Sequence, residues 1–523
     1  MHIYNPITRY VVLIVVLLVS LSTAGCTPGA VTAPTRLPAN PAINTAPPTV
    51  TTMPGTAIDA PVLVSAASIS RPVSPIATLT PSPEISLNPS ESYFTVDGKQ
   101  SFLFSRNITG AYNTDFSDFE KFLTYAQAAG DRVVRLQIDN LGLGFNSAGA
   151  VDENWAQKWE HIFDLASAKG LAIIPEFGVW LWWSNDGLWK DNPLNTVKGG
   201  PATTPGELFK RDSDTQQRWL RFVQKLVERW QPRQSIIAWE IFSEINLASG
   251  SSDQNALDFV EPAAATIRGA DPHKRPVTVS VADVVSVWSS VNQSQAIDFL
   301  EVHPYPVDGK LDRAIVDLVG QRIRDFHRPV LIGESGLTGL SPDPFTRQPR
   351  AHYGIEHALW ADLVSGAMNG RALWDQDSYA IYWTGATDAE KQKFIEDYAR
   401  TEVPVVNFVK GLDFAGFLPL NVSFAPATNV WGAAVGNERM IIGWFRDAQC
   451  EPPDWNLQPT LSKQAVAIVV SGPASHWKVD FYDTRTGTKI IGSATVTRVN
   501  NRVIIPLPDF TDDIAFKLYP QLE

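Results

Sequence analysis

Residues 236–246 read IIAWEIFSEIN, and this stretch decides the fold class. It is mostly apolar and ends by presenting a carboxylate, Glu244, just before Asn246. A short apolar run bounded by polar residues is typical of a strand that is buried on both faces, as in parallel sheets. The stretch therefore predicts a buried strand with Glu244 at its C-terminal end.

The same texture recurs from Tyr93 onward, where short apolar runs alternate with amphipathic helical segments, several of which end in Gly. The predicted strands are residues 102–108, 132–138, 171–177, 235–242, 276–281, 297–303, 329–335 and 371–376. Eight strand–helix repeats indicate an α/β fold of the (β/α)8 TIM-barrel type. A doubly wound open sheet is the alternative, but no Gly-rich phosphate loop follows any of these strands.

In such barrels the reactive groups lie at the C-terminal ends of the strands. Functional side chains stand at most of these ends, namely Arg135, Glu176, Ser243 with Glu244, His303 with Tyr305, Glu334 and Trp374. Side chains alternate along a strand, which allows both Glu244 and Glu334 to face the barrel interior. We therefore expect two carboxylates on opposite sides of one mouth.

Two carboxylates in one cleft raise each other's cost of ionisation, so one is expected to stay protonated near neutral pH. Glycoside hydrolysis needs this division. The protonated group gives its proton to the leaving oxygen, and the charged group attacks or stabilises the sugar centre or activates water. Glu240 and Glu301 lie deeper on their strands, and we expect both to pair with a cation in the barrel.

The segments IIAWEIFSEIN, FLEVHPYP and PVLIGESG, with VVRL upstream and RALWD downstream, resemble the cellulase and mannanase group of glycoside hydrolase family 5. The resemblance covers about Tyr93 to Asp377 and extends to the clan of retaining (β/α)8 enzymes. It implies that Glu244 is the acid/base and Glu334 the nucleophile. It also implies that Arg135 orients the nucleophile.

By the same resemblance, His303 and Tyr305 form the strand-six pair beside the nucleophile, and Trp374 is the floor of the sugar site. Ser243 departs from the family pattern, because the family normally has Asn there to bind the sugar 2-hydroxyl. That contact is expected to be lost, bridged by water or supplied from another loop. Glu176 stands where many members have His, and it is a candidate substrate contact.

A cluster of tryptophans, VWLWWSNDGLW, follows the third strand. Flat aromatic faces in a solvent-facing loop suit the C–H faces of pyranoses, so Trp180, Trp182 and Trp183 are candidate subsite residues. Packing of the loop onto the barrel rim is the alternative.

The first 26 residues predict an exported lipoprotein: one Arg, an apolar run from Val11 to Val19, and TAGC, which resembles the lipidation motif that ends at Cys26. Thr23 departs from that motif, where Leu is usual, and a plain N-terminal membrane anchor is the alternative. Residues 27–92 are rich in Pro, Thr and Ser and predict a disordered linker. We expect a protein at the cell surface or outside the cell, held to the membrane by its lipid.

Residues 93–410 make up the predicted catalytic barrel, and residues 411–523 change to short alternating strands. The second segment predicts a small β-sandwich accessory domain, with Asn500 and Asn501 in a hairpin turn.

The net charge of −12 and the isoelectric point near 5.2 disfavour a nucleic-acid partner and fit a neutral ligand. No metal-ligand spacing is present, and the chemistry needs no cofactor. The sequence thus predicts a retaining β-glycoside hydrolase of the endo-β-mannanase or endo-β-1,4-glucanase type, which acts on β-linked polysaccharide or oligosaccharide such as β-mannan or β-glucan. Three alternatives remain: a non-catalytic carbohydrate-binding surface lipoprotein, a scaffold or adhesion protein that works through the β-sandwich, and a transglycosylase.

Overall fold

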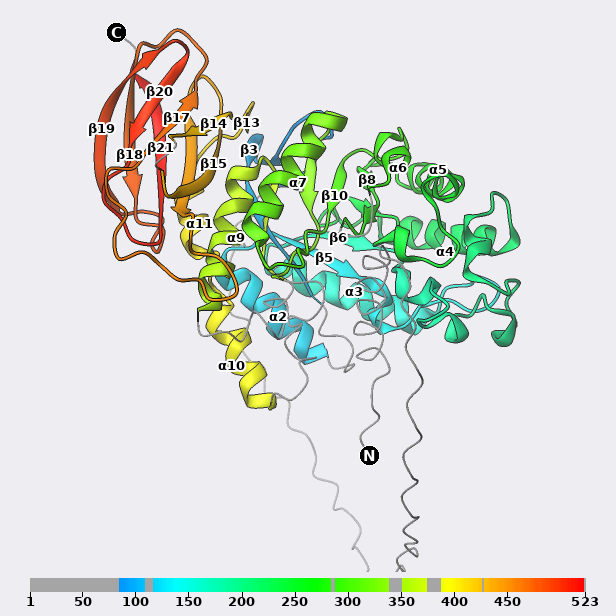
Figure 1. The fold of residues 1–523 in the computed structure, drawn as a ribbon. Coiled ribbons are helices and arrows are strands. Elements are labelled where there is room, and N and C mark those ends of the chain that lie inside the picture. Colours follow the sequence, from blue (N-terminus) through cyan, green and yellow to red (C-terminus); the bar gives the residue numbers. More distant parts are fainter. Residues whose placement is uncertain are drawn as a thin grey trace, which may run out of the picture. The chain divides into compact units, whose positions relative to one another are not determined.

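The structure is a computed structural model that describes residues 84–108, 116–283, 287–337, 350–373, 387–425 and 428–521. Parallel strands lie at the centre of the larger part of the fold, with helices around them (Figure 1). The strands are β4 (Leu103–Asn107), β5 (Val133–Gln137), β6 (Ala172–Glu176), β7 (Trp239–Glu240), β8 (Val277–Thr278), β9 (Ser280–Val281), β10 (Leu300–Val302), β11 (Val330–Ile332) and β12 (Asn369–Arg371). Since β8 and β9 are consecutive pieces of one strand, eight strand positions result.

The strands close into a barrel. Neighbours follow the order β12-β4-β5-β6-β7-β8 and β9-β10-β11, and β12 pairs with β4 in parallel. Between β11 and β12 the side chain of Asn369 completes the ring: its Oδ1 accepts from the Ile332 N–H at 2.8 Å and its Nδ2 donates to the Ile332 carbonyl at 2.9 Å. The predicted (β/α)8 barrel is confirmed.

The helices pack with their apolar residues against the strands or against one another. They are α2 (Phe116–Ala129), α3 (Glu153–Ala168), α4 (Asp214–Trp230), α5 (Asp253–Ala270), α6 (Ser289–Gln293), α7 (Leu311–Phe326), α9 (Ala351–Ser365), α10 (Asp388–Tyr398) and α11 (Val403–Val409). Helix α4 illustrates how the sequence sets both the start of a helix and its buried side. Ser213 caps it by accepting from the Gln216 N–H, and Trp219 and Trp230 are fully buried on its apolar side. Within the described ranges, no helix combines the length and the apolar character needed to cross a membrane.

A small antiparallel sheet precedes the barrel, with β1 (Ile85–Ser86), β2 (Phe94–Val96) and β3 (Lys99–Ser101) in that order. Asp97 and Gly98 join β2 to β3, and both have positive φ, as a two-residue hairpin turn requires. Because β1 pairs with β2 and Leu87 is buried, the expected end of the linker at residue 92 is too late.

The C-terminal part is an antiparallel all-β domain of nine strands, in the order β13-β15-β16-β21-β18-β19-β20-β17-β14. They are β13 (Leu418–Pro419), β14 (Val422–Phe424), β15 (Val430–Gly436), β16 (Ile441–Asp447), β17 (Ala465–Val469), β18 (His476–Tyr482), β19 (Ile490–Val499), β20 (Arg502–Pro506) and β21 (Asp513–Gln521). Its own core includes Phe445, Trp477 and Ile505. Asn500 and Asn501 form the β19–β20 turn with φ of 48° and 60°, as predicted.

Helix α9 joins the barrel to this β domain, and the two form one compact unit. Most of α9 is buried, as expected for a helix that is apolar nearly all round. Gly354 lies against the Trp455 ring, and a Cβ there would come within 2.8 Å of the ring. The His357 Nε2 lies 2.8 Å from Asp512 Oδ1, and Arg446 forms a buried ion pair with Asp312.

Candidate active site

Glu244 is presented by a sharp turn just after β7. Its backbone is left-handed, with φ 52° and ψ 49°, a conformation that costs a residue with a Cβ and that is enriched at functional sites. Its N–H donates to Ser280 Oγ at 3.0 Å. Asn246 fixes the turn through reciprocal hydrogen bonds with the backbone of Ala282 at 2.7 and 3.1 Å. As a result Ile245 is buried in the core, while the Glu244 side chain keeps 15% of its surface exposed.

Glu334 follows β11 and is held by three donors. Arg135 Nη1 donates to its Oε1 at 2.8 Å, the Tyr305 hydroxyl donates to its Oε2 at 3.0 Å, and Gln137 Nε2 donates to Oε1 at 3.3 Å. Burial alone would raise the pKa of Glu334, but the charges of His303 and Arg135 and the Tyr305 hydrogen bond hold it below its ordinary value. Glu334 is therefore set to be a carboxylate.

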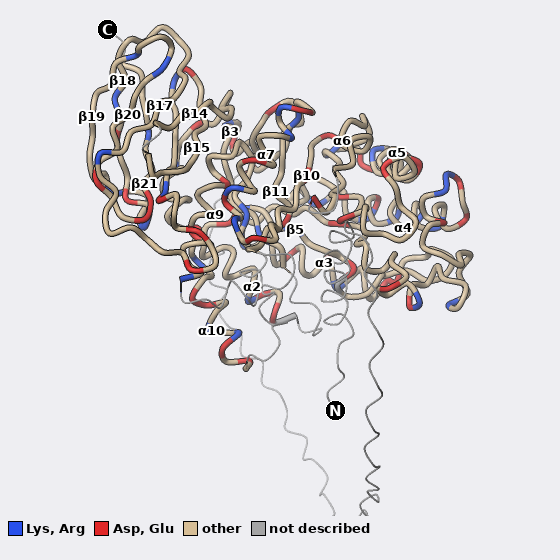
Figure 2. The backbone as a smooth tube through the Cα atoms, in the orientation of Figure 1, with Lys and Arg blue, Asp and Glu red and all other residues tan. Residues whose placement is uncertain are grey.

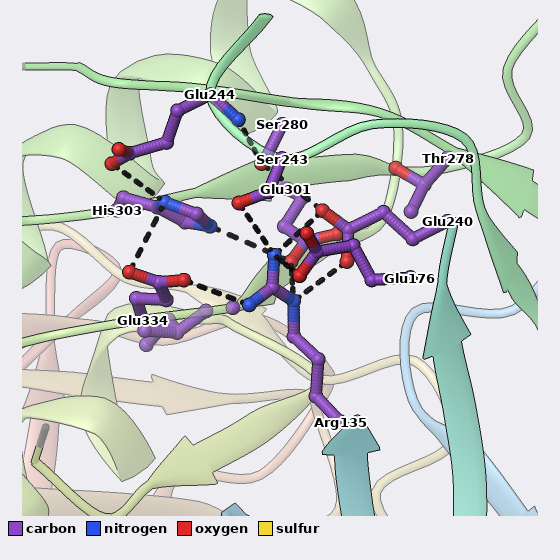
Figure 3. A network of polar contacts seen from close by, with 12 residues as sticks. Arg135, Glu176, Glu240, Ser243, Glu244, Thr278, Ser280, Glu301, His303 and Glu334 are labelled. Atoms are coloured by element: carbon purple, nitrogen blue, oxygen red, sulfur yellow. Dashed lines mark hydrogen bonds and ion pairs between the residues drawn. The ribbon is translucent and has the colours of Figure 1, made fainter. Parts of the chain in front are cut away.

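His303 lies between the two acids. Figure 3 shows its ring between the carboxyl groups of Glu244 and Glu334. Nδ1 is 3.1 Å from Glu244 Oε1 and 3.7 Å from Glu334 Oε2, and Nε2 is 3.5 Å from Glu301. Burial lowers the pKa of His303, but the charge of Glu334 and hydrogen bonds to Glu244 and Glu301 raise it to about 10. The ring is thus an imidazolium at neutral pH.

The two acids are close together. Glu244, His303 and Glu334 each place one ligand-type atom within 4.8 Å of the others. Retaining glycosidases separate their carboxyl groups by about 5–5.5 Å and inverting ones by about 6.5–9.5 Å. Two carboxyl oxygens this close fit the shorter of these two separations.

Arg135 anchors a second layer beneath the acids and is almost fully buried. Its Nε and Nη2 donate to the two oxygens of Glu240 at 2.6 and 2.7 Å, and it lies 3.0 Å from both Glu176 and Glu301. Burial would lower the pKa of Arg135, but the carboxyl groups around it, with Glu240 first, raise it well above its usual value. As expected, Glu240 and Glu301 pair with a barrel cation.

Burial opposes ionisation of the carboxyl groups around Arg135. Burial raises the pKa of Glu176 well above its ordinary value, against the opposing charge of Arg135. Burial likewise raises the pKa of Glu240 to about 7. An unpaired buried carboxylate is expensive, and the guanidinium of Arg135 offsets that cost for the acids around it. Arg135 also donates to Glu334 and stabilises its charge.

Three candidate substrate contacts, Glu176, Ser243 and Trp183, are buried. Glu176 has no exposed surface and is ion-paired with Arg135, so it is not open to a sugar. Ser243 is buried, and its Oγ accepts from Arg135 Nη2 at 2.9 Å. Trp183 is also fully buried and packs against Trp189, with ring centroids 5.7 Å apart, so the alternative of loop packing holds there.

Of the remaining candidate residues, the structure describes two and leaves two outside its described ranges. Trp180 and Trp182 are partly buried against the core and keep some exposed surface. Trp374 and Cys26 lie outside the described residues.

Sequence reasoning missed three supporting residues. Gln137 shares the barrel-facing side of β5 with Arg135, two positions along. Ser280 binds both the Glu244 N–H and Glu240 Oε1, and Asp283 accepts from the His303 N–H at 2.8 Å. The signal for Ser280 was available: Thr278 and Ser280 alternate with valines in the fifth strand, which is typical of polar groups that face a barrel interior.

Comparison with known structures shows the same fold. A structure titled "Glycoside hydrolase" is 12% identical, with a TM-score of 0.57, and the match covers 84% of this chain and 97% of that one. A glycoside hydrolase family 5 protein from Bacteroides vulgatus ATCC 8482 is 11% identical, with a TM-score of 0.58, covering 84% and 93%. Comparison with curated protein sequences gives no significant match.

A match to a protein-family model identifies the family of this chain. The model described as "Cellulase (glycosyl hydrolase family 5)" matches residues 95–361, which span the barrel from its N-terminal hairpin to helix α9. This match covers more than half of the chain, and it includes both acids and Arg135. The chain therefore belongs to glycosyl hydrolase family 5.

Proposed function

We propose that this glycoside hydrolase cleaves β-linked polysaccharide or oligosaccharide by double displacement, with Glu334 as nucleophile and Glu244 as acid/base. The observation that carries the proposal is the pair of carboxyl groups with one oxygen of each within 4.8 Å of the other, one group fixed by three donors and the other partly exposed. That separation suits a covalent sugar intermediate.

In the first step Glu334 attacks the anomeric carbon as the glycosidic C–O bond breaks. Glu244 gives its proton to the departing oxygen, so the electron pair of the broken bond leaves as a neutral hydroxyl. Arg135, Gln137 and Tyr305 keep Glu334 charged and aimed before the attack. Such fixed donors cost no reorganisation when the reaction occurs.

In the second step Glu244, now a carboxylate, takes a proton from water, and the resulting hydroxide displaces Glu334 from the anomeric carbon. His303 lies 3.1 Å from Glu244, and its positive charge at neutral pH faces the negative charge that Glu244 carries between the two steps. The product keeps the β configuration, because two inversions restore it. A sugar hydroxyl in place of water would give transglycosylation by the same route.

As substrate we propose β-linked mannan or glucan. Two observations support this choice: the matching family model is the cellulase model, and the strand-end motifs resemble the cellulase and mannanase group. The burial of Ser243 and its bond to Arg135 remove it as a direct partner for the 2-hydroxyl, so other groups must bind that position.

We also propose export and attachment to the membrane through lipid on Cys26. The apolar run from Val11 to Val19 and the TAGC segment support this. A Cys26→Ser chain is expected in the soluble fraction instead of the membrane fraction. Equal membrane partition of both chains would refute lipid attachment and favour a plain anchor.

The reaction is tested by screening wild type, Glu334→Ala and Glu244→Ala against β-mannan, β-glucan, β-xylan and their oligomers. Glu120→Ala, on the exposed side of α2, is the matched control. We expect hydrolysis by wild type and control, loss in Glu334→Ala, and a first-formed β-anomer by ¹H NMR. Binding without any product would refute the proposal and favour a carbohydrate-binding lipoprotein.

A further inference from the structure

A second concave site lies away from the acids. A pocket of about 560 Å³ is lined by helices α9 to α11, the turn after β18 and the start of β21. Its volume is within the roughly 300–1,000 Å³ of small-molecule sites. Its residues come from outer helices and from the β domain, whereas Glu244 and Glu334 lie at the ends of barrel strands. The two sites share no residue.

Aromatic rings give this pocket apolar surface. Tyr353 packs against His352 with ring centroids 4.1 Å apart, and both are only half-buried. Trp360 backs the pocket wall; it is almost fully buried and packs edge-on against Phe408 at 5.1 Å, so the exposed ring surface is that of Tyr353 and His352. Rings held in this way offer flat apolar area without a further loss of side-chain freedom.

Several charged groups in the pocket have unused hydrogen-bonding capacity. Over the part of the chain that the structure describes, neither a hydrogen bond nor an ion pair engages the side chains of Glu356, Arg400 or Arg485. Glu356 is half-buried, so its carboxyl group faces the pocket with its acceptor oxygens unengaged. Planar groups of this type bind vicinal hydroxyls in pairs.

The mixture of acidic and basic side chains in the pocket indicates which class of ligand fits it. Three carboxyl groups, Glu356, Asp397 and Asp513, line the same pocket as two guanidinium groups. Figure 2 shows acidic and basic residues mixed over the outer helices and the β domain. A phosphate would face the carboxylates and a simple cation would face the guanidinium groups. A neutral polyhydroxyl ligand with flat C–H faces meets both the rings and the mixed polar rim.

We infer that this pocket is a second saccharide-binding site, to which the β domain contributes Thr484, Arg485 and Asp513. Naming a saccharide rests on the proposed function. A glycan chain held here and in the catalytic cleft at once is retained more strongly than one held by the cleft alone, because the second contact is intramolecular. The β domain is then part of substrate capture.

The test is affinity electrophoresis of the full chain in native gels that contain soluble glucomannan. Arg485→Ala and Glu356→Ala remove pocket contacts, while Lys489→Ala, an exposed residue near the same turn but outside the pocket, is the matched control. We expect Arg485→Ala to bind about tenfold more weakly, as for the loss of a charged hydrogen bond, and Glu356→Ala to bind more weakly as well. Lys489→Ala should behave as wild type.

Hydrolysis of a small aryl β-glycoside, measured on the same proteins, separates this inference from the proposed function. All three variants should keep wild-type kcat/KM on the small substrate, because it fills the cleft alone. Equal retention of Arg485→Ala and Lys489→Ala, or no retention of wild type, would overturn the second site. Loss of retention in Arg485→Ala, with no hydrolysis by wild type, would refute the function and leave the site standing.

Discussion

Tyr305→Phe removes one donor from the proposed nucleophile while keeping the ring in place. The Tyr305 hydroxyl donates to Glu334 Oε2 at 3.0 Å. A hydrogen bond to a charged group is worth roughly 1.5–3 kcal/mol, which corresponds to a loss of about 10- to 150-fold in rate if the bond supports the reacting state. We expect kcat/KM on an aryl β-glycoside to fall within that range.

The pH profile of kcat/KM shows whether the loss of rate in Tyr305→Phe comes from a change in the pKa of Glu334. Glu334 must be ionised to attack, and its pKa is held below the ordinary value partly by the Tyr305 hydrogen bond. Loss of that bond raises the pKa of Glu334, so the acidic limb of kcat/KM should move to higher pH. Tyr353→Phe, in the outer pocket, is the matched control and should leave the limb in place. An acidic limb that stays fixed in Tyr305→Phe, or moves to lower pH, would refute the reasoning.

Three further predictions follow. Glu244→Ala should lose about 10²–10⁴-fold in kcat on polysaccharide and far less on a dinitrophenyl glycoside, whose leaving group needs no proton; equal losses on both would rule out the acid role. His303 has a folded pKa of about 10 against an ordinary 6.5, so its contribution to stability is complete below pH 6.5 and is lost as pH rises through 10. The free energy of unfolding in urea should decline over that window in wild type, and His303→Gln should flatten the decline; identical slopes would contradict the charged state. Asn501→Val should destabilise the β domain by about 1–2 kcal/mol because φ is 60° there, whereas Asn501→Gly should not; thermal unfolding of the two variants measures the difference.

The barrel could be predicted because its strands and helices are each specified by a short stretch of sequence. Each strand reads as an apolar run, and each helix carries its own apolar stripe and a Gly or polar boundary. The exact ends of the strands could not be predicted, since pairing with neighbours sets them. Strand β7 spans only Trp239–Glu240, although the predicted strand runs to Phe242. The turn at Asn500 and Asn501 was predictable from its two residues alone.

The position of the acids was also predictable, because strand ends in a closed barrel meet at one rim. The contacts that these residues make could not be predicted from the sequence. Glu176 and Ser243 are both engaged by Arg135, which comes from another strand. Trp183 belongs to a loop that folds back on Trp189, so its burial depends on residues that follow it. Such burial arises from packing between segments, so it cannot be predicted from a short stretch of sequence.

The central claim is tested most directly by trapping the sugar on the protein. An activated 2-deoxy-2-fluoro β-glycoside slows the second step, so the covalent intermediate accumulates and can be located by mass spectrometry of peptides. The account predicts one added sugar per chain, on the peptide that contains Glu334, and no label in Glu334→Gln. Label on a different acid, or an α-anomer as the first product of wild type, would contradict it.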